Sequence, residues 1–247
     1  MRPAGLKTKI FLDSGSPQDT AKALGLLGFL DGQTTNPSLV AKSSEAQKRL
    51  AGGKKFSKQE VLEFYKSIVS EISGIIPNGS VSVEVYADKF TTPEHIIKEA
   101  VMMNEWIPNA HIKLPIILNG LEAAQKLAGM GMRLNMTLCF SQEQAAAVNA
   151  AVQPNFHKAG DFFISPFIGR LDDIGKNGAD LIKNILKMYT TQIAELSGRV
   201  SVLAASIRSV DHLLAVFGVG ADIVTVPLSI LEKWVQMGMP VSANSIA

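Results

Sequence analysis

The sequence is poor in several features that mark common protein classes. It contains one cysteine, Cys139, so no internal disulfide can form, and the protein suits a reducing compartment. We expect Cys139 to be a small buried apolar residue. No uninterrupted apolar run has the length of a membrane helix, and residues 1–9 lack the apolar stretch of a secretory signal. We therefore expect a cytoplasmic enzyme without a membrane partner.

An excess of charge of one sign and clusters of metal ligands are also missing. The formal net charge is +2, which does not favour a nucleic-acid or membrane surface. The four histidines are scattered without the spacing of metal ligands, and no Gly-x-Ser-x-Gly motif is present. We expect no metal site, no serine-hydrolase triad and no nucleic-acid partner.

What the sequence does contain is an even alternation of short apolar strands and amphipathic helices over 247 residues. Because each crossover is a helix, the strands should be parallel, and either an open doubly wound sheet or a closed barrel would satisfy the pattern. Eight even repeats favour an α/β fold of the (β/α)8 TIM-barrel type, with residues 1–247 in a single domain. The predicted strands cover residues 9–13, a segment ending at Asn36, and residues 81–87, 111–115, 133–139, 161–166, 199–205 and 221–226.

Local signals mark several of the predicted helices. Ser57 and Glu60 form a capping box after the loop-like stretch 51–55, and Pro93 stands at the tolerated first position of another helix. The helix that follows Ser57 carries an apolar stripe of Val61, Tyr65, Ile68 and Ile72. The other predicted helices cover residues 17–27, 121–127, 180–196, 210–217 and 228–236, and one more is capped by Ser141 and Gln144.

Polar side chains recur on one face of the predicted strands. In a barrel, the outward face packs against helices, and the inward face can carry a site near the carboxyl ends of the strands. Ser82, Glu84 and Tyr86 share the inward parity of their strand, whereas Leu138 falls on the outward parity of a later one. The same division recurs in five strands, which is hard to attribute to chance. The convergent set is Asp13, Asn36, Glu84, Lys113, Asn135, Thr137 and Ser165.

Lys113 is the most reactive group of this set. Desolvation by its apolar neighbours favours a neutral amine, which can attack a carbonyl and form an imine. Asp13 and Glu84 could supply the proton transfers that imine formation and carbon–carbon cleavage require. Taken alone, Lys113 is better explained as a lysine that extends from a strand end into solvent. Each acid is about equally well explained as a strand-end residue bonded to backbone N–H groups. His111, on the same face, is interpreted as a satisfied interior histidine.

Two arginines follow the sixth and seventh predicted strands. Arg170 and Arg208 lie where loops of such barrels commonly bind phosphate, and the guanidinium group matches phosphate geometry. The competing interpretation is surface pairing with Asp172 or Asp211.

Several specific motifs occur in order over nearly the whole chain. They are Phe11-Leu-Asp13, Thr34-Thr-Asn-Pro-Ser38, Val83-Glu-Val85, Ile112-Lys-Leu-Pro115, Leu134-Asn-Met-Thr137, Ile164-Ser-Pro-Phe-Ile-Gly-Arg-Leu-Asp-Asp173 and Leu203-Ala-Ala-Ser-Ile-Arg208. With these motifs the sequence resembles the transaldolase family, and especially its short-chain branch. The resemblance implies a (β/α)8 barrel that needs no metal or organic cofactor.

The resemblance also implies an activity of the non-oxidative pentose phosphate pathway. A dihydroxyacetone unit would pass from sedoheptulose 7-phosphate or fructose 6-phosphate to glyceraldehyde 3-phosphate or erythrose 4-phosphate, through a Schiff base. Lys113 would form the Schiff base, Asp13 would be the acid/base group, and Glu84 with Thr137 would hold a catalytic water. The groups implied to bind the substrate are Asn36, Asn135, Ser165, Phe167, Arg170, Ser206 and Arg208.

Three departures from the family pattern are visible. Ile117 stands where many relatives carry a threonine, and residues 44–58 look longer than in the shortest relatives. The tail after Gly238 looks short and lacks a helical extension that often meets a neighbouring subunit. We therefore expect a homo-oligomer but leave its state open.

Two alternative functions accompany the transaldolase interpretation. A fructose 6-phosphate aldolase would use the same chemistry but release free dihydroxyacetone. A non-enzymatic sugar-phosphate-binding barrel would require the loss of a catalytic position, and the sequence retains every one of them.

Overall fold

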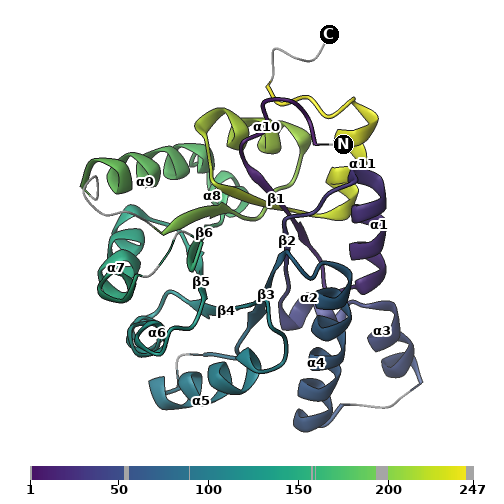
Figure 1. Cartoon of the computed structure of the whole chain (residues 1–247), viewed down its shortest axis with the longest axis vertical. Helices are drawn as coiled ribbons and strands as arrows, with labels where there is room; N and C mark the ends of the chain where they lie inside the picture. The colour runs from purple at the N-terminus through teal and green to yellow at the C-terminus, as the bar shows by residue number, and fades with distance from the viewer. Residues whose placement is uncertain are drawn as a thin grey trace.

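Eight parallel strands follow one another in chain order around a closed barrel, in which β8 pairs with β1. The computed structural model describes residues 2–52, 56–88, 90–156, 158, 160–192 and 200–242. Figure 1 shows the strands at the centre with the helices arranged around them, which confirms the predicted (β/α)8 barrel. The strands are β1 (Lys9–Asp13), β2 (Gly32–Thr34), β3 (Ser80–Glu84), β4 (Ala110–Pro115), β5 (Leu134–Cys139), β6 (Phe162–Pro166), β7 (Ser201–Ala204) and β8 (Ile223–Val226).

The helices begin where the sequence supplies caps. Ser57 accepts the N–H of Glu60, whose side chain bonds back to Ser57, so the predicted capping box is present. The hydroxyls of Thr92 and Ser141 cap two further helices by accepting the N–H groups of His95 and Gln144. The helices are α1 (Pro17–Leu27), α2 (Pro37–Ala41), α3 (Ser44–Ala51), α4 (Lys58–Ile75), α5 (Pro93–Asn104), α6 (Leu118–Gly129), α7 (Gln142–Val152), α8 (Ile168–Asp172), α9 (Gly178–Gln192), α10 (Val210–Val219) and α11 (Leu228–Gln236), with a 3-10 turn at Gln153–Asn155.

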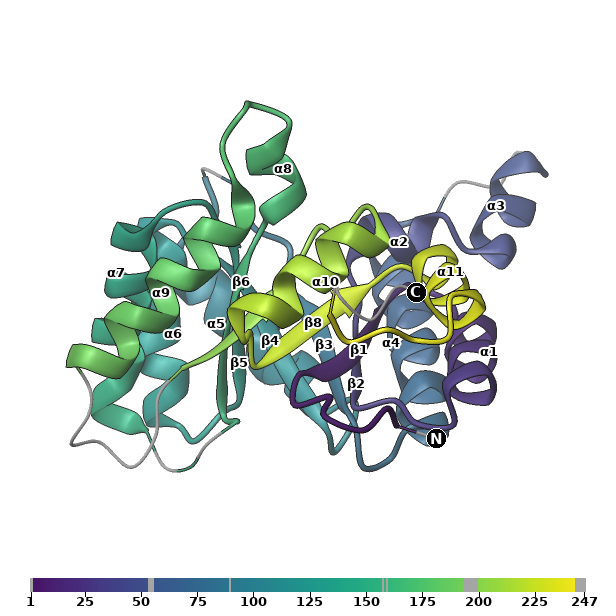
Figure 2. The same ribbon diagram turned by 90° about the horizontal axis from the view of Figure 1, so that it is seen from above.

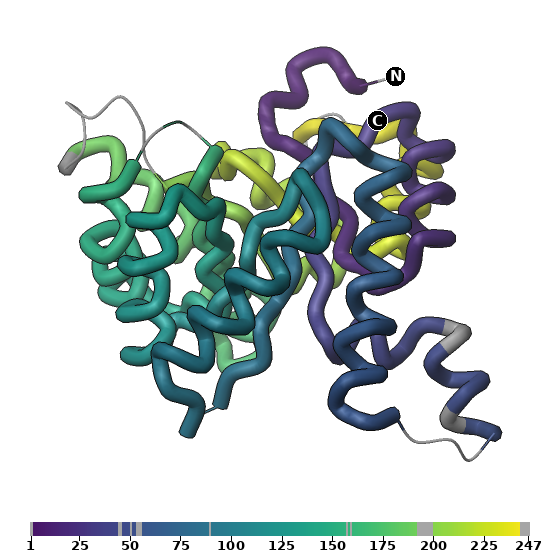
Figure 3. The backbone as a smooth tube through the Cα atoms, turned by 60° about the horizontal axis from the view of Figure 1, so that its bottom comes forward, coloured from purple at the N-terminus to yellow at the C-terminus, as the bar shows by residue number. Residues whose placement is uncertain are grey.

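Several predicted boundaries were wrong. The third strand ends at Glu84 rather than at residue 87, and Val61 is 44% exposed although it continues the apolar stripe of α4. The short helices α2 and α8 were not predicted, and part of the segment 44–58 folds as α3. Figure 2 shows α3 and α8 projecting away from the barrel, and Figure 3 shows the α3 segment standing apart from it. Residues 193–199, which include the expected end of one helix and start of one strand, lie outside the described residues.

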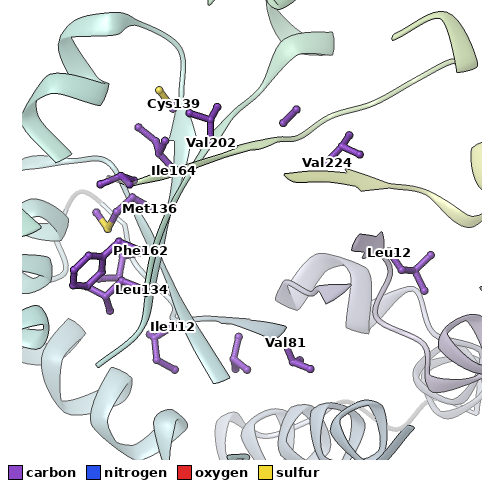
Figure 4. Packing of buried hydrophobic residues seen from close by; sticks show 14 of the residues in the cluster. Leu12, Val81, Ile112, Leu134, Met136, Cys139, Phe162, Ile164, Val202 and Val224 are labelled. Carbon is purple, nitrogen blue, oxygen red and sulfur yellow. The ribbon is translucent and has the colours of Figure 1, made fainter. Parts of the chain in front are cut away.

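The main hydrophobic core lies between the barrel and its helices. Outward side chains such as Ile112, Ile164 and Val202 are fully buried there, and Figure 4 shows how they leave the strands on the helix side. Cys139 belongs to this core, and burial raises the pKa of its thiol to about 12, which agrees with the predicted small buried residue. None of the described helices is long and apolar enough to cross a membrane.

A second, smaller apolar cluster fills the inside of the barrel. It comprises Phe11, Phe163, Leu203, Ala205 and Ile223, all contributed by inward positions of the strands or the ends of strands. His111 stacks on Phe163, with 4.2 Å between ring centroids. Its Nε2 lies 2.8 Å from the Gly160 carbonyl oxygen and its Nδ1 2.7 Å from the Ser80 hydroxyl. Burial lowers the pKa of His111 to about 3, so this histidine is a neutral interior residue with both nitrogens bonded.

Candidate active site

The only described ion pair buried within the barrel joins Lys113 and Glu84. Lys113 lies on the inward face of β4, and its Nζ is 2.9 Å from Oε2 of Glu84 at the end of β3. The side chains are 7% and 21% exposed, so the pair is sheltered yet reachable from the mouth of the barrel. The parallel register Glu84↔Lys113 places the two residues side by side. A buried amine next to a carboxylate can exchange a proton without the aid of bulk water.

Asp13 ends β1 inside the same mouth. Its Oδ1 accepts a hydrogen bond of 2.9 Å from the Thr34 hydroxyl, which lies 2.6 Å from the Thr225 hydroxyl. Burial raises the pKa of the Asp13 carboxyl, and the charge of Lys113 and the Thr34 hydrogen bond oppose that rise. A carboxyl with a raised pKa returns a proton more readily than an ordinary aspartate, as an acid/base group must.

A chain of polar side chains crosses the barrel beside Lys113. The Asn135 amide donates to the Ser82 hydroxyl over 3.0 Å, and the Ser165 hydroxyl donates to Asn135 Oδ1 over 2.7 Å. All three residues are buried, and they come from β5, β3 and β6. Their mutual bonds fix the positions of hydroxyl and amide groups that could hold the hydroxyls of a sugar.

Thr137 and Leu138 lie where β5 becomes irregular. The β5–β6 register shifts between Met136 and Cys139, and Leu138 takes a left-handed conformation (φ 64°) with its side chain 37% exposed. The predicted outward, core-facing position of Leu138 was therefore wrong. Thr137 remains inward and buried, and its hydroxyl forms no hydrogen bond with any described residue. It is a buried polar group two residues beyond Asn135, which is the register partner of Lys113.

Asn36 sits between β2 and α2. Its Oδ1 accepts the N–H of Leu39 at 2.8 Å and so caps α2, which begins at Pro37. Because the carboxamide oxygen is committed to the helix, a role in binding substrate would fall to the amide NH2 group.

The loops after β6 and β7 are bonded to each other. The N–H groups of Ile168 and Gly169 donate to the carbonyls of Ala205 and Ser206, at 3.1 and 3.2 Å. Ser206 adopts a left-handed conformation (φ 63°) at this junction. A Cβ atom at Gly169 would collide with the Ser206 carbonyl oxygen, so glycine is required for this approach.

The two predicted phosphate ligands lie on these bonded loops. Arg208 forms a bidentate pair with Asp173, with Nη2 to Oδ2 at 2.6 Å, rather than with Asp172 or Asp211 as the competing interpretation held. The guanidinium carbon of Arg170 lies 5.9 Å from the centre of the Phe167 ring. Both arginines are exposed; Arg170 lies on α8, directly after β6, and Arg208 lies on the segment after β7 to which the start of α8 is bonded.

The structure thus brings the predicted site residues to one end of the barrel, at the carboxyl ends of β1 to β7. The set of site residues predicted from the sequence left out four supporting groups. Inward parity was the signal for Thr34, Ser82 and Thr225, whereas nothing in the sequence marks Tyr65, whose hydroxyl bonds to the Glu84 backbone at 2.9 Å. Among the described residues, no group of three or more His, Cys, Asp and Glu side chains could hold a metal ion.

Comparisons with known proteins agree with this arrangement. The sequence matches the family described as transaldolase/fructose-6-phosphate aldolase over residues 10–246. It is 37% identical to a probable transaldolase from Dehalococcoides mccartyi, over 97% of this chain and 94% of that protein. It is 38% identical to a probable transaldolase from Brucella anthropi, over 92% and 89% of the two chains.

One solved structure of a protein with a different activity in its name has a similar fold. Thiamine phosphate pyrophosphorylase from Pyrococcus furiosus superposes with a TM-score of 0.52 at 12% identity, covering 94% of this chain and 95% of that one, which shows a shared fold alone. The family match and the relatives carry the assignment. The protein is an enzyme of the aldolase/transaldolase type, and the chain belongs to the transaldolase/fructose-6-phosphate aldolase family.

Proposed function

We propose that the protein is a transaldolase that transfers a dihydroxyacetone unit between sugar phosphates through an imine on Lys113. The observation that carries the proposal is the sheltered contact of Lys113 with Glu84 in a mouth that also holds Asp13. The donor would be fructose 6-phosphate or sedoheptulose 7-phosphate, and the acceptor glyceraldehyde 3-phosphate or erythrose 4-phosphate. These are substrates of the non-oxidative pentose phosphate pathway, to which the same proposal assigns the enzyme, in the cytoplasm.

The first half of the reaction forms the imine. The neutral Lys113 amine attacks the keto carbon of the donor, and the resulting carbinolamine loses water to give a protonated imine. Glu84, 2.9 Å from the amine, accepts the proton that the ammonium group must lose and returns one to the departing hydroxyl. The Thr137 hydroxyl, which bonds to none of the described residues, orients the water that enters or leaves at this carbon.

The second half breaks and remakes the carbon–carbon bond. Asp13 takes the proton of the C4 hydroxyl, the C3–C4 bond breaks, and its electron pair moves into the imine to give an enamine while the aldose departs. An acceptor aldehyde then adds by the reverse steps, and Asp13 returns the proton to its oxygen. Asn135, the register partner of Lys113, and Ser165, which bonds to Asn135, hold hydroxyls of the three-carbon unit. Asn36 adds its amide NH2 group from the end of β2.

The proposal is tested by separating transfer from release. Fructose 6-phosphate is supplied with and without erythrose 4-phosphate, and sedoheptulose 7-phosphate and free dihydroxyacetone are both measured. We expect transfer to dominate. Release of dihydroxyacetone as fast as transfer would instead identify a fructose 6-phosphate aldolase. Turnover of neither kind, with sugar phosphates still bound, would identify a binding protein.

Phe167 should govern how the enamine is partitioned between these two fates. Its ring lies at the mouth, partly buried against the inner apolar cluster, and offers no hydroxyl to a hydrolytic water. Phe167→Tyr adds a phenol that can relay a proton, so the share of released dihydroxyacetone should rise. The two products are measured for both proteins in the same assay. Phe167→Leu is the matched control, because it changes the ring without adding a hydroxyl, and an equal rise in that variant would exclude proton relay.

Arg170 and Arg208 should bind the phosphate groups of donor and acceptor. A charge-assisted hydrogen bond contributes roughly 1.5–3 kcal/mol, so Arg170→Ala or Arg208→Ala should raise KM for a phosphorylated ketose by roughly 10- to 100-fold. KM for unphosphorylated fructose should change little. Arg133→Ala is the control, because Arg133 bonds to the Pro108 carbonyl near the start of β5, at the opposite end of the barrel. Equal losses on both kinds of ketose would mean that the two arginines are structural.

A further inference from the structure

β3 continues beyond the end of β2. One backbone N–H of β3 therefore has no partner on β2 and bonds to a side chain instead. The β2–β3 register ends at Thr34↔Ser82, because Asn36 and Pro37 begin α2. Thr35 still donates its N–H to the Ser82 carbonyl at 3.1 Å. The next N–H of β3 on this side belongs to Glu84, and it donates to the hydroxyl of Tyr65 at 2.9 Å. A side chain from α4 thus takes the place of a strand partner.

The hydroxyl of Tyr65 is part of a chain with a defined direction. The Thr35 hydroxyl donates its proton to the Ser82 carbonyl at 2.7 Å, so the Tyr65 hydroxyl must donate to Thr35 Oγ1, also at 2.7 Å, while its oxygen accepts the N–H of Glu84. Burial raises the pKa of Tyr65, so the hydroxyl keeps its proton. The ring is 2% exposed and packs edge-on against Trp106, with 5.9 Å between centroids. Every donor in this chain has an acceptor.

The Tyr65 hydrogen bond completes the support of Glu84. On the β4 side, the N–H of Val85 donates to the Lys113 carbonyl at 3.2 Å, and on the β2 side Tyr65 holds the N–H of Glu84 itself. The backbone is therefore fixed from both neighbours at the last residue of the strand, where ends normally fray. The same hydroxyl also holds Thr35, the residue before Asn36.

We propose that Tyr65 is a positioning residue for the reaction, which fixes the Glu84 carboxylate next to Lys113 through the Glu84 backbone N–H. This inference rests on the proposed function, in which Glu84 serves the formation of the imine. A misplacement of about 1 Å in an active site can cost up to roughly 100-fold in rate, so the Tyr65 hydroxyl influences catalysis without touching the substrate. In the proposed function, phosphate binding depends on Arg170 and Arg208 instead. Removal of the Tyr65 hydroxyl should therefore leave KM unchanged.

The test follows the rate at which borohydride traps fructose 6-phosphate on Lys113, together with kcat and KM for transfer. Tyr65→Phe keeps the ring and removes the hydroxyl, so kcat and the trapping rate should both fall by about tenfold while KM stays close to its original value. Thr35→Val should act in the same direction, and Thr35→Ser, which retains the hydroxyl, should restore the rate. The double variant Tyr65→Phe with Thr35→Val should be no slower than the slower single variant, because both changes break one chain.

Tyr189→Phe is the matched control. Tyr189 is 1% exposed and its hydroxyl donates to the Ala145 carbonyl at 2.9 Å, so this variant also loses a buried hydroxyl, between α9 and α7. It should melt at a lower temperature and yet trap substrate at the original rate. A normal trapping rate in Tyr65→Phe, or additive losses in the double variant, would overturn the inference alone. No adduct on Lys113 in the unchanged enzyme would overturn the proposed function and this inference with it.

Discussion

Lys113→Met should reduce transfer of the dihydroxyacetone unit by roughly 10⁴-fold or more, since removing a nucleophile has effects of this size or larger. Methionine has a similar length and suits the apolar neighbours of Lys113, but it cannot form an imine. In the unchanged enzyme, borohydride added with fructose 6-phosphate should attach the sugar to the peptide that contains Lys113. Peptide mass spectrometry locates the adduct, and an enzymatic assay measures the loss of transfer.

The control for this variant is Lys126→Met. Lys126 lies on the exposed face of α6, where its Nζ is 2.9 Å from Glu122, so its loss should leave activity intact. Because Lys113→Met leaves the Glu84 carboxylate without its partner, the melting temperature of the variant should be recorded as well. Locating the adduct in the unchanged enzyme does not depend on the variant. An adduct on another lysine, or near-normal turnover by Lys113→Met, would refute the central role of Lys113.

Asp13→Asn should slow cleavage by about 10²–10⁴-fold, the usual contribution of a general acid/base group. The imine should still form, because Lys113, Glu84 and Thr137 are unchanged. The covalent intermediate should therefore accumulate, and borohydride should trap more of it than in the unchanged enzyme at the same time point. Normal turnover by Asp13→Asn would assign the acid/base role to another residue.

The pH dependence of cleavage gives an independent check on Asp13. Burial raises the pKa of this carboxyl above the ordinary value of 3.8, and only the ionised form can take the hydroxyl proton. The rate of cleavage should therefore rise with pH over a range above the one in which an ordinary aspartate titrates. This rise should be absent from the pH–rate profile of Asp13→Asn.

The sign of the same pKa shift predicts the stability of the variant. Folding disfavours the ionised form of Asp13, so this residue stabilises the folded state below pH 3.8 and loses that contribution as the pH rises through the raised pKa. At neutral pH, a neutral asparagine avoids the cost of burying the charge, and Asp13→Asn should melt no lower than the unchanged enzyme. A marked drop in melting temperature would leave misfolding as the cause of any lost activity.

Much of this site follows from the sequence because the positions inside a barrel repeat every second residue. Once the strands around Asp13, Glu84 and Lys113 are recognised, parity alone directs the three side chains inward, and closure of the barrel brings them together. The inward parity of Asn135 and Ser165 likewise leads to the polar chain next to the lysine. These predictions depend only on local periodicity and on the fold.

The remaining features depend on contacts that local periodicity does not encode. Leu138 leaves its predicted face because β5 bulges against β6, which is a property of two strands. Arg208 chooses Asp173 because the loops after β6 and β7 are bonded to each other. Tyr65 looks like one more apolar position on α4, and only the short length of β2 makes its hydroxyl necessary.

The apolar cluster inside the barrel has a consequence for the order of events. Phe11, Phe163 and Ile223 are almost fully buried, so packed side chains close the floor of the barrel beneath Lys113. Substrates can therefore enter and leave only through the mouth. In the proposed reaction, the first aldose must therefore leave by the passage through which the second arrives. The enzyme then alternates between a free and a three-carbon-loaded form, and its two substrates never meet. Ping-pong kinetics of this kind follow from the covalent imine, and the closed floor adds that both aldoses must use the same opening.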